Sequence, residues 1–363
     1  MTSIIILMFL ALAFVYINGF HDTSNAIATV VSTRALPPHQ AIWLATLTNL
    51  AGALVGTAVA ATIAHGLVNA AAITPNTIIA ALVGAIVWDL ITWWYGLPSS
   101  SSHALIAGLC GAALASAGND WSEIVWAAPA GSHWWHGNGV FYKVIVPMFL
   151  SPLLGFLAAF VLNGVFYVLL RNWPVMRVDN VFGRLQILSG GYIGFAHGHN
   201  DAQKTVGVVI LALAAATQAG TFDQAPAWLG FLRTETTPAD APMPVARWLQ
   251  ISCALALAAG TAAGGWRIIR TMGRKITKLR PIHGFSAETS AATVLTVVAA
   301  MGFPVSTTHT ITAAVGGVGA SQRFSALHWN IIRRILWAWV LTPPAAALVA
   351  YLTMQALRLA GWK

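Results

Sequence analysis

The sequence predicts an all-α polytopic membrane protein with two inverted-topology repeats, each made of two spans, a re-entrant hairpin and a third span. Apolar residues make up 57% of the 363 residues and charged residues only 8%, and the mean hydropathy is +0.71. A water-soluble chain of this length could not bury so much apolar surface, so lipid must cover part of it. The other two observations are a series of apolar segments of spanning length and two apolar segments with polar centres.

The predicted spans are based on length, because a helix needs about 20 apolar residues to cross a bilayer. Residues 1–17 could also be the apolar part of a signal peptide, but no basic segment precedes them and no cleavage site is convincing. We therefore expect a retained first span. The six predicted spans are residues 1–31, 41–63, 144–170, 186–217, 246–266 and 335–360.

Two further segments, residues 76–118 and 284–320, are apolar at both ends and polar at the centre. The centres read Pro98-Ser-Ser-Ser-Ser-His103 and Pro304-Val-Ser-Thr-Thr-His309. A proline interrupts a helix, and hydroxyl groups are poorly accommodated in lipid unless they face protein. We therefore predict two helical hairpins, each with a polar tip.

The distribution of basic residues tests this order of elements, because cytoplasmic loops collect lysine and arginine. With both hairpins re-entrant, 13 of the 19 basic residues lie on one side, which we assign to the cytoplasm. Both termini are then extracytoplasmic in a cell (inner) membrane protein, and the two repeats begin on opposite sides. The predicted division is residues 1–170 for the first repeat, 171–185 for a cytoplasmic linker and 186–363 for the second repeat.

Composition also excludes two classes of protein. The net charge of +9 comes from basic residues scattered through short loops rather than gathered on one face, so we expect no nucleic-acid partner. The two cysteines, Cys110 and Cys253, lie far apart in apolar segments, which argues against a disulfide framework and against a cysteine metal site.

The two hairpin centres share the pattern G-x-P-x-S-[ST]-[ST]-H-x7-G, which begins at Gly96 and at Gly302. A helix that starts after such a proline leaves its first N–H groups unpaired and directs its positive dipole end at the membrane centre. Hydroxyl donors added at each tip give a cage suited to a tetrahedral oxyanion. Serine and threonine after a proline can also simply cap a helix, and this alternative stays open. The candidate anion-binding residues are Ser100, Ser101, Ser102, Ser306, Thr307 and Thr308.

Four of the ten acidic residues, including Asp89, lie inside apolar segments, where a charge must be paired or functional. Two of them are in register in a weaker repeat, Gly19-Phe-His-Asp22-Thr-Ser-Asn25 and Gly198-His-Asn-Asp201-Ala-Gln-Lys204. Lys204 lies one helical turn after Asp201 and can compensate its charge, although this pair could be purely structural. We predict a coupling-ion or metal site with the candidate ligands Asp22, Asn25, Asn200, Asp201 and Glu288.

Histidines lie beside both motifs. His103 and His309 end the two tip patterns and are candidate proton carriers, although a histidine in an apolar segment can also be a packing residue. A less favoured alternative is a zinc site formed by the three histidines nearest the aspartates, His21, His197 and His199.

Two other functional classes can be weighed against a transporter. An intramembrane hydrolase with a nucleophilic serine would need one serine with a dedicated base, whereas the hydroxyl residues here occur in duplicated runs. A passive channel is also possible, but carboxylates in the membrane centre beside an anion site fit coupled transport better.

The chain resembles the PiT inorganic phosphate transporters, in particular the bacterial Pit-type low-affinity, proton-coupled members, over nearly its whole length. The resemblance rests on Asn18-Gly-Phe-His-Asp-Thr-Ser-Asn-Ala26, Gly96-Leu-Pro-Ser-Ser-Ser-Ser-His103, His197-Gly-His-Asn-Asp-Ala-Gln-Lys204, Phe285-Ser-Ala-Glu288 and Pro304-Val-Ser-Thr-Thr-His309.

The resemblance implies a symporter, not an enzyme, that holds phosphate at the tip hydroxyls and cations at the two Asp-centred motifs. It implies no tightly bound cofactor, but a coupling cation, either a proton or sodium, and in some relatives a divalent metal that travels with phosphate. The implied partners are inorganic phosphate, membrane lipid and a second copy of the chain in a homodimer. A sodium-coupled phosphate permease or a sulfate permease of the same fold is the alternative.

The sequence departs from the family pattern at several positions. His199 stands where a small residue is usual, and Asp89 stands where the resemblance leads us to expect asparagine. Lys204 corresponds to Asn25 of the first repeat, and its ammonium group could occupy the volume of one bound cation. The hydrophilic loop of many relatives is reduced here to about residues 218–245. We therefore expect fewer sodium ions than in sodium-coupled relatives and favour protons.

Overall fold

The structure is a computed structural model that describes residues 1–362 apart from residues 70–71, 129–136, 224, 235–244 and 275. Among the described residues, four helical segments are long and apolar enough to cross a membrane, or up to six if each of two bent pairs counts as one span. The four are α1 (Thr2–Ser32), α4 (Pro75–Tyr95), the continuous η4 (Phe141–Ile145) and α6 (Val146–Leu169), and α12 (Trp329–Leu359). The protein is therefore a multi-pass, α-helical membrane protein, as its composition predicts.

The predicted spans 41–63 and 246–266 correspond to two bent helix pairs. Helix α2 (Pro38–Ala53) is followed by α3 (Ala58–Gly66) at a bend of 65°, and α8 (Arg247–Ala263) by α9 (Trp266–Arg274) at 70°. A glycine with positive φ lies in each break, Gly56 at 79° and Gly264 at 74°. Residues with a side chain rarely adopt this left-handed backbone, so the two glycines allow the helices to end there.

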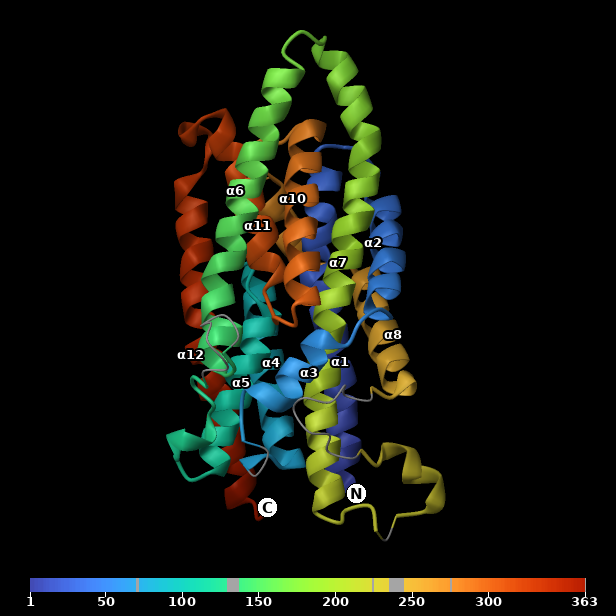
Figure 1. Ribbon diagram of the computed structural model, residues 1–363, viewed down its shortest axis with the longest axis vertical. Coiled ribbons are helices and arrows are strands. Elements are labelled where there is room, and N and C mark those ends of the chain that lie inside the picture. Colours follow the sequence, from blue (N-terminus) through green and yellow to red (C-terminus); the bar gives the residue numbers. More distant parts are fainter. Residues whose placement is uncertain (70–71, 129–136, 224, 235–244, 275, 363) are drawn as a thin grey trace.

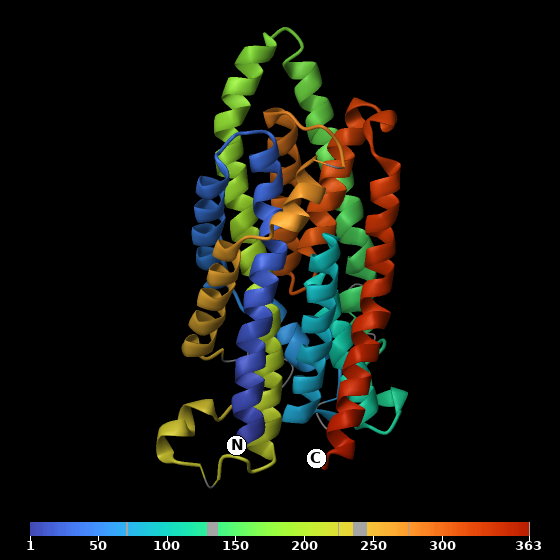
Figure 2. The same cartoon turned by 180° about the vertical axis from the view of Figure 1, so that it is seen from behind.

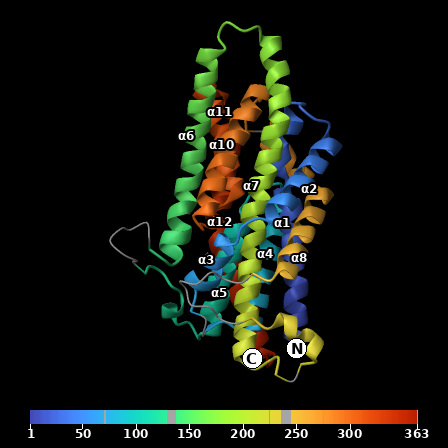
Figure 3. The ribbon, with the colours of Figure 1, turned by 45° about the vertical axis from the view of Figure 1, so that its right-hand side comes forward.

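Helix α7 (Val175–Gln218) is 44 residues long and begins inside the predicted linker 171–185. Pro174 precedes its first helical residue, a position that proline favours. At 1.5 Å per residue the helix is about 66 Å long, well beyond the ~30 Å of a hydrocarbon core. Figure 3 shows it running from the connection with α6 to the end where the termini lie.

Both predicted hairpins are present. The first consists of α4 and α5 (Ser101–Ser116), the second of α10 (Pro281–Ala300) and α11 (Thr307–Gln322). Each turns at the matched glycine of the tip pattern, where φ is 63° at Gly96 and 78° at Gly302. The hairpins enter from opposite ends of the molecule (Figure 1). Their tips meet near its middle, where the rings of His103 and His309 are 4.8 Å apart.

Each hairpin packs against the last helix of the other repeat. Helix α5 packs along α12, and α11 packs along α6. Both chain ends lie at one end of the molecule, and the connection between α6 and α7 lies at the other (Figures 1 and 2). The remaining short helices, η2 (Trp121–Glu123), η5 (Ala227–Leu232) and η6 (Phe324–Ala326), lie in loops. This arrangement places the two polar tips between α1 and α7, which carry the aspartate motifs.

Candidate functional site

Two of the six candidate hydroxyls cap helices. The Ser100 side chain accepts a hydrogen bond from the backbone N–H of His103 at 3.1 Å, and Ser306 accepts one from His309 at 3.1 Å. Because each satisfies one free N–H at the start of its helix, the capping alternative holds for these two serines. The tips are thereby fixed as helix N-termini directed at the membrane centre.

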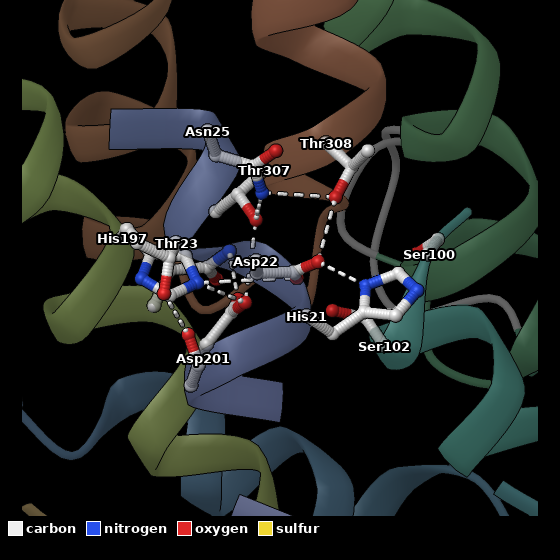
Figure 4. A network of polar contacts seen from close by, with 12 residues as sticks. His21, Asp22, Thr23, Asn25, Ser100, Ser102, His197, Asp201, Thr307 and Thr308 are labelled. Carbon is white, nitrogen blue, oxygen red and sulfur yellow. Dashed lines mark hydrogen bonds and ion pairs between the residues drawn. The ribbon is translucent and has the colours of Figure 1, made fainter. Parts of the chain in front are cut away.

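The threonines of the second tip contact the carboxylates of α1 and α7 (Figure 4). Thr307 Oγ1 donates to Asp201 Oδ2 at 3.2 Å, and Thr308 Oγ1 donates to Asp22 Oδ1 at 3.3 Å. The Asn25 amide donates to both hydroxyls, at 3.3 Å to Thr307 and 2.9 Å to Thr308. The tip of one repeat therefore closes over the aspartates of both repeats.

The structure brings Asp22 and Asp201 together through a histidine. His197 Nε2 lies 3.1 Å from Asp201 Oδ2 and 3.9 Å from Asp22 Oδ2. One ligand atom from each of these three buried side chains lies within 4.8 Å of the other two. The other ring nitrogen of His197 is 2.8 Å from Asn49 Oδ1, which fixes the orientation of the ring. Two carboxylates and an imidazole can together hold a divalent cation.

The zinc alternative from the sequence is not supported by this geometry. His21 Nδ1 contacts Asp22 Oδ1 at 2.7 Å, but His199 stacks on Phe195 with 6.2 Å between ring centroids. His199 is also only partly buried, whereas His197 is fully enclosed. His197, which contacts both aspartates, lies one helical turn before Asp201. That spacing could have identified this histidine from the sequence.

Lys204 forms the predicted ion pair and also ties the two hairpin tips together. Its Nζ lies 2.5 Å from Asp201 Oδ1, donates to the Val305 carbonyl at 2.7 Å and contacts Ser102 Oγ. The side chain is almost fully buried. One ammonium group therefore links α7 to the first tip through Ser102 and to the second through Val305.

Two buried amide oxygens beside the aspartates have no hydrogen-bond partner among the described residues. They are Asn25 Oδ1 and Asn200 Oδ1. The Asn200 amide nitrogen donates to the Val305 carbonyl at 2.9 Å and to Asp201 Oδ1 at 3.1 Å, so this side chain is held in place while its oxygen stays available. Buried carbonyl oxygens normally have partners, and cations are common ones.

Glu288, the remaining predicted cation ligand, does not join this cluster. Its carboxylate accepts hydrogen bonds from Gln186 Nε2 at 2.8 Å and from Ser189 Oγ at 2.5 Å, both on the first half of α7. Gln186 in turn accepts from Thr33 at 2.7 Å. The carboxylate is thus paired inside a separate polar cluster, because α10 presents it to a more N-terminal part of α7 than the part that carries Asp201.

The two candidate proton carriers differ in their surroundings. The His309 ring stacks on Trp339 with 3.9 Å between centroids, and the Trp339 indole donates to the Pro98 carbonyl at 3.1 Å. Both ring nitrogens of His103 lack a hydrogen-bond partner in the described part of the chain. The contacts place both histidines behind the tips, with no direct bond to either aspartate.

Sequence reasoning missed a set of hydroxyl groups behind Asp22. His21 Nε2 lies 3.1 Å from Thr92 Oγ1, and Ser99 donates to the same hydroxyl at 2.8 Å. This continues the contacts from Asp22 through His21 into the first hairpin. Thr92 is an isolated polar residue in an apolar segment, which was the available signal.

Known proteins are similar to this chain over most of its length. The model of the Phosphate transporter family matches residues 18–350. A probable low-affinity inorganic phosphate transporter of Rhizobium meliloti is 43% identical over 352 residues, which cover 95% of this chain and 94% of that protein. Proteins of the same description are 39% identical in Bacillus subtilis, with 94% and 93% covered, and 40% identical in Mycobacterium leprae, with 99% and 79% covered.

Among solved structures, the sodium-dependent phosphate transporter matches with a TM-score of 0.78 and 23% identity over 99% of this chain and 100% of that chain. At this identity the likeness shows the fold alone. The matched family consists of transporters rather than enzymes, so the hydrolase alternative is set aside. By the match of a single family model to most of its length, and by relatives at about 40% identity, the chain belongs to the Phosphate transporter family.

Proposed function

We propose that the protein is a symporter that carries inorganic phosphate into the cell together with a cation, and that the cation is a proton. The observation that carries this proposal is the meeting of two hairpin tips, from opposed halves of the molecule, over two buried carboxylates. The tip hydroxyls of Ser101, Ser102, Thr307 and Thr308 would hold the phosphate. Neutral donors and helix N-termini bind an oxyanion without trapping it.

Charge balance supports coupling to a cation. Phosphate would bind beside Asp22 and Asp201, and buried like charges repel one another strongly. Lys204 offsets one carboxylate, while His21 and His197 can each take up a proton. A further positive charge that arrives with phosphate favours its binding, and by linkage phosphate favours the binding of that charge.

The side chains around the two aspartates also indicate which cations the site would bind. Asp22, His197 and Asp201 would suit a divalent metal that travels with phosphate as a neutral complex. Lys204 fills the position that matches Asn25 of the first repeat, so an ammonium group replaces one site for sodium. Protons therefore fit the second half of the site better than sodium does.

Substrate choice follows from hydrogen bonding. Phosphate at neutral pH still carries a proton that it can donate to Asp22 or Asp201, whereas sulfate carries none. The site retains acceptors next to the tip hydroxyls, which favours phosphate over sulfate. Alternation of the site between the two sides would come from movement of one inverted half against the other. The extracytoplasmic termini and the homodimer are further proposals, which rest on charge distribution and on the family resemblance.

The test is uptake of labelled phosphate by the purified protein in liposomes, with pH and sodium gradients imposed separately and with excess sulfate as competitor. We expect accumulation driven by the pH gradient and unaffected by sulfate. Accumulation that follows a sodium gradient and ignores pH would overturn the proton assignment. Inhibition by sulfate without phosphate accumulation would overturn the substrate.

A further inference from the structure

Asp89, in the middle of α4, is a buried carboxylate that the site described above does not use. It is 0% exposed, and neither carboxylate oxygen has a hydrogen-bond partner among the described residues. Asp22, Asp201 and Glu288, the other acids in apolar segments, each contact a cation, a histidine or hydrogen-bond donors. An unpaired carboxylate inside a membrane protein is costly when charged, which points to a bound ligand or a bound proton.

The groups around Asp89 connect it to the candidate site. Helix α4, which carries Asp89, packs on α1 with the Asp22 motif, on α5 of the first tip and on α7 with the Asp201 motif. One turn along α4, Thr92 donates to the Asp89 carbonyl and contacts the His21 ring. Asp89 is therefore on the hairpin that forms the hydroxyl cage, one turn before the threonine that contacts His21.

Other elements packed on α4 bring few charged groups to this point. Helix α9 supplies Arg267, whose guanidinium lies over the rings of Trp93 and Trp94 at 5.0 and 4.2 Å and donates to the Trp94 carbonyl. Helix α12 offers Thr342, which accepts from the Trp88 indole at 2.9 Å. Of the ionisable groups on α5 and α7, His103 has no hydrogen-bond partner among the described residues and Lys204 is held by Asp201. No described cation forms an ion pair with Asp89.

A metal or sodium ion does not fit this position. Such an ion needs several oxygen ligands, whereas the Asp89 oxygens have no hydrogen-bond partner among the described residues that could join them in a ligand set. A proton needs only the carboxyl group itself and removes its charge. A neutral carboxyl group can also donate a hydrogen bond to a hydroxyl oxygen in the cage.

We propose that Asp89 carries the proton that is transported with phosphate, an inference that rests on the proposed symport. In the loaded state the O–H bond of the carboxyl group is intact and the buried side chain is neutral. When the site opens to the cytoplasm, the O–H bond breaks, the proton passes to water and the carboxylate remains. It is protonated again from water when the site opens to the outside.

The experiment compares wild-type protein with Asp89→Asn in liposomes that contain a pH-sensitive dye. Two quantities are measured, exchange of labelled against unlabelled phosphate at equal pH, and the acidification of the interior that accompanies net phosphate uptake. Asparagine is a neutral mimic of the protonated acid, so exchange should persist. Acidification should fall to the level of protein-free liposomes, and Asp89→Glu should restore it.

The matched control is Asp120→Asn. Asp120 is an exposed loop residue, and hydrogen bonds from Ser122 lower the pKa of its carboxyl group, so it is charged at neutral pH. This variant should retain both exchange and acidification. The same substitution is thus made at one exposed and one buried aspartate.

If the Asp89→Asn variant acidifies the interior as much as the wild type does, the inference is overturned while the proposed function stays intact. Loss of exchange in a folded Asp89→Asn variant would also overturn it, since Asp89 would then serve binding. Absence of exchange in the wild type would overturn the proposed function itself, and the inference with it. If Asp89→Asn does not fold, the infrared spectrum decides: the inference expects a protonated-carboxyl band that shifts in Asp89→Glu, and no such band would overturn it.

Discussion

At the scale of single residues, side chains of the same chemical type serve two different purposes at the hairpin tips. Ser100 and Ser306 accept from backbone N–H groups and fix the starts of α5 and α11. Thr307 and Thr308 instead donate to the carboxylates of Asp201 and Asp22. The difference follows from position, because the residue that precedes a helix can reach its free N–H groups and the next two residues point outward from the tip.

This division predicts different outcomes for two substitutions in the second tip. Thr307→Val keeps the shape of the side chain but removes the hydroxyl, so phosphate should bind about tenfold more weakly, in line with the ~1.5 kcal/mol of a hydrogen bond to a charged group. Ser306→Ala removes a cap and should lower the free energy of unfolding by about 1 kcal/mol. The concentration dependence of uptake and thermal unfolding in detergent measure the two effects. Unchanged phosphate affinity in Thr307→Val would remove this hydroxyl from the binding site.

At the scale of elements, the hairpins are held by the opposite repeat at matched glycines. A Cβ atom on Gly111 of α5 would lie 2.2 Å from the Ala347 carbonyl of α12, and one on Gly317 of α11 would lie 2.2 Å from the Phe156 carbonyl of α6. These are the glycines that end the repeated tip pattern. Close backbone approach of this kind is how helices pack in membranes, where small residues form the contact.

Gly317→Ala should therefore destabilise the protein, because α11 and α6 must separate to admit the methyl group. We expect a loss of about 1–3 kcal/mol in the free energy of unfolding. Gly316→Ala is the matched control, since a Cβ there would meet only the Phe156 ring at an ordinary 3.8 Å. Its stability should stay within about 0.5 kcal/mol of the wild type. Equal melting temperatures of the two variants would contradict the packing argument.

At the scale of the whole molecule, the positions of the chain ends and the distribution of basic residues are consistent with the predicted topology. The termini lie together at one end, and the α6 to α7 connection lies at the other (Figure 1). The basic loops predicted to be cytoplasmic include the loop that joins α6 to α7 and the segment around α9. The fold alone does not choose which end faces the cytoplasm, and the excess of lysine and arginine is what predicts the orientation.

This orientation can be measured with single cysteines in a variant whose Cys110 and Cys253 are replaced by alanine. Asn172 lies in the α6 to α7 loop and Ser122 near the opposite end, and both are exposed. A membrane-impermeant maleimide should label Ser122→Cys in intact cells. It should label Asn172→Cys only after the cells are made permeable. The reverse pattern would place the termini in the cytoplasm.

The sequence by itself determined the features that depend on neighbouring residues. The hairpin bounds 76–118 and 284–320 match α4 with α5 and α10 with α11, because prolines and glycines end helices locally. The Asp201 to Lys204 pair is present because residues three apart share one helix face. Membrane insertion followed from composition alone.

Only the tertiary structure decided which distant side chains meet. His197 contacts Asp22 across 175 residues of chain, and Glu288 contacts Gln186 and Ser189. Asp89 has no hydrogen-bond partner within the part of the chain that the structure describes. The tertiary structure also decided two larger features: the bends after Ala53 and Ala263, and the packing of each hairpin on the opposite repeat. These outcomes depend on how helices rotate and cross, which hydrophobic patterning leaves open when helices are apolar on most faces.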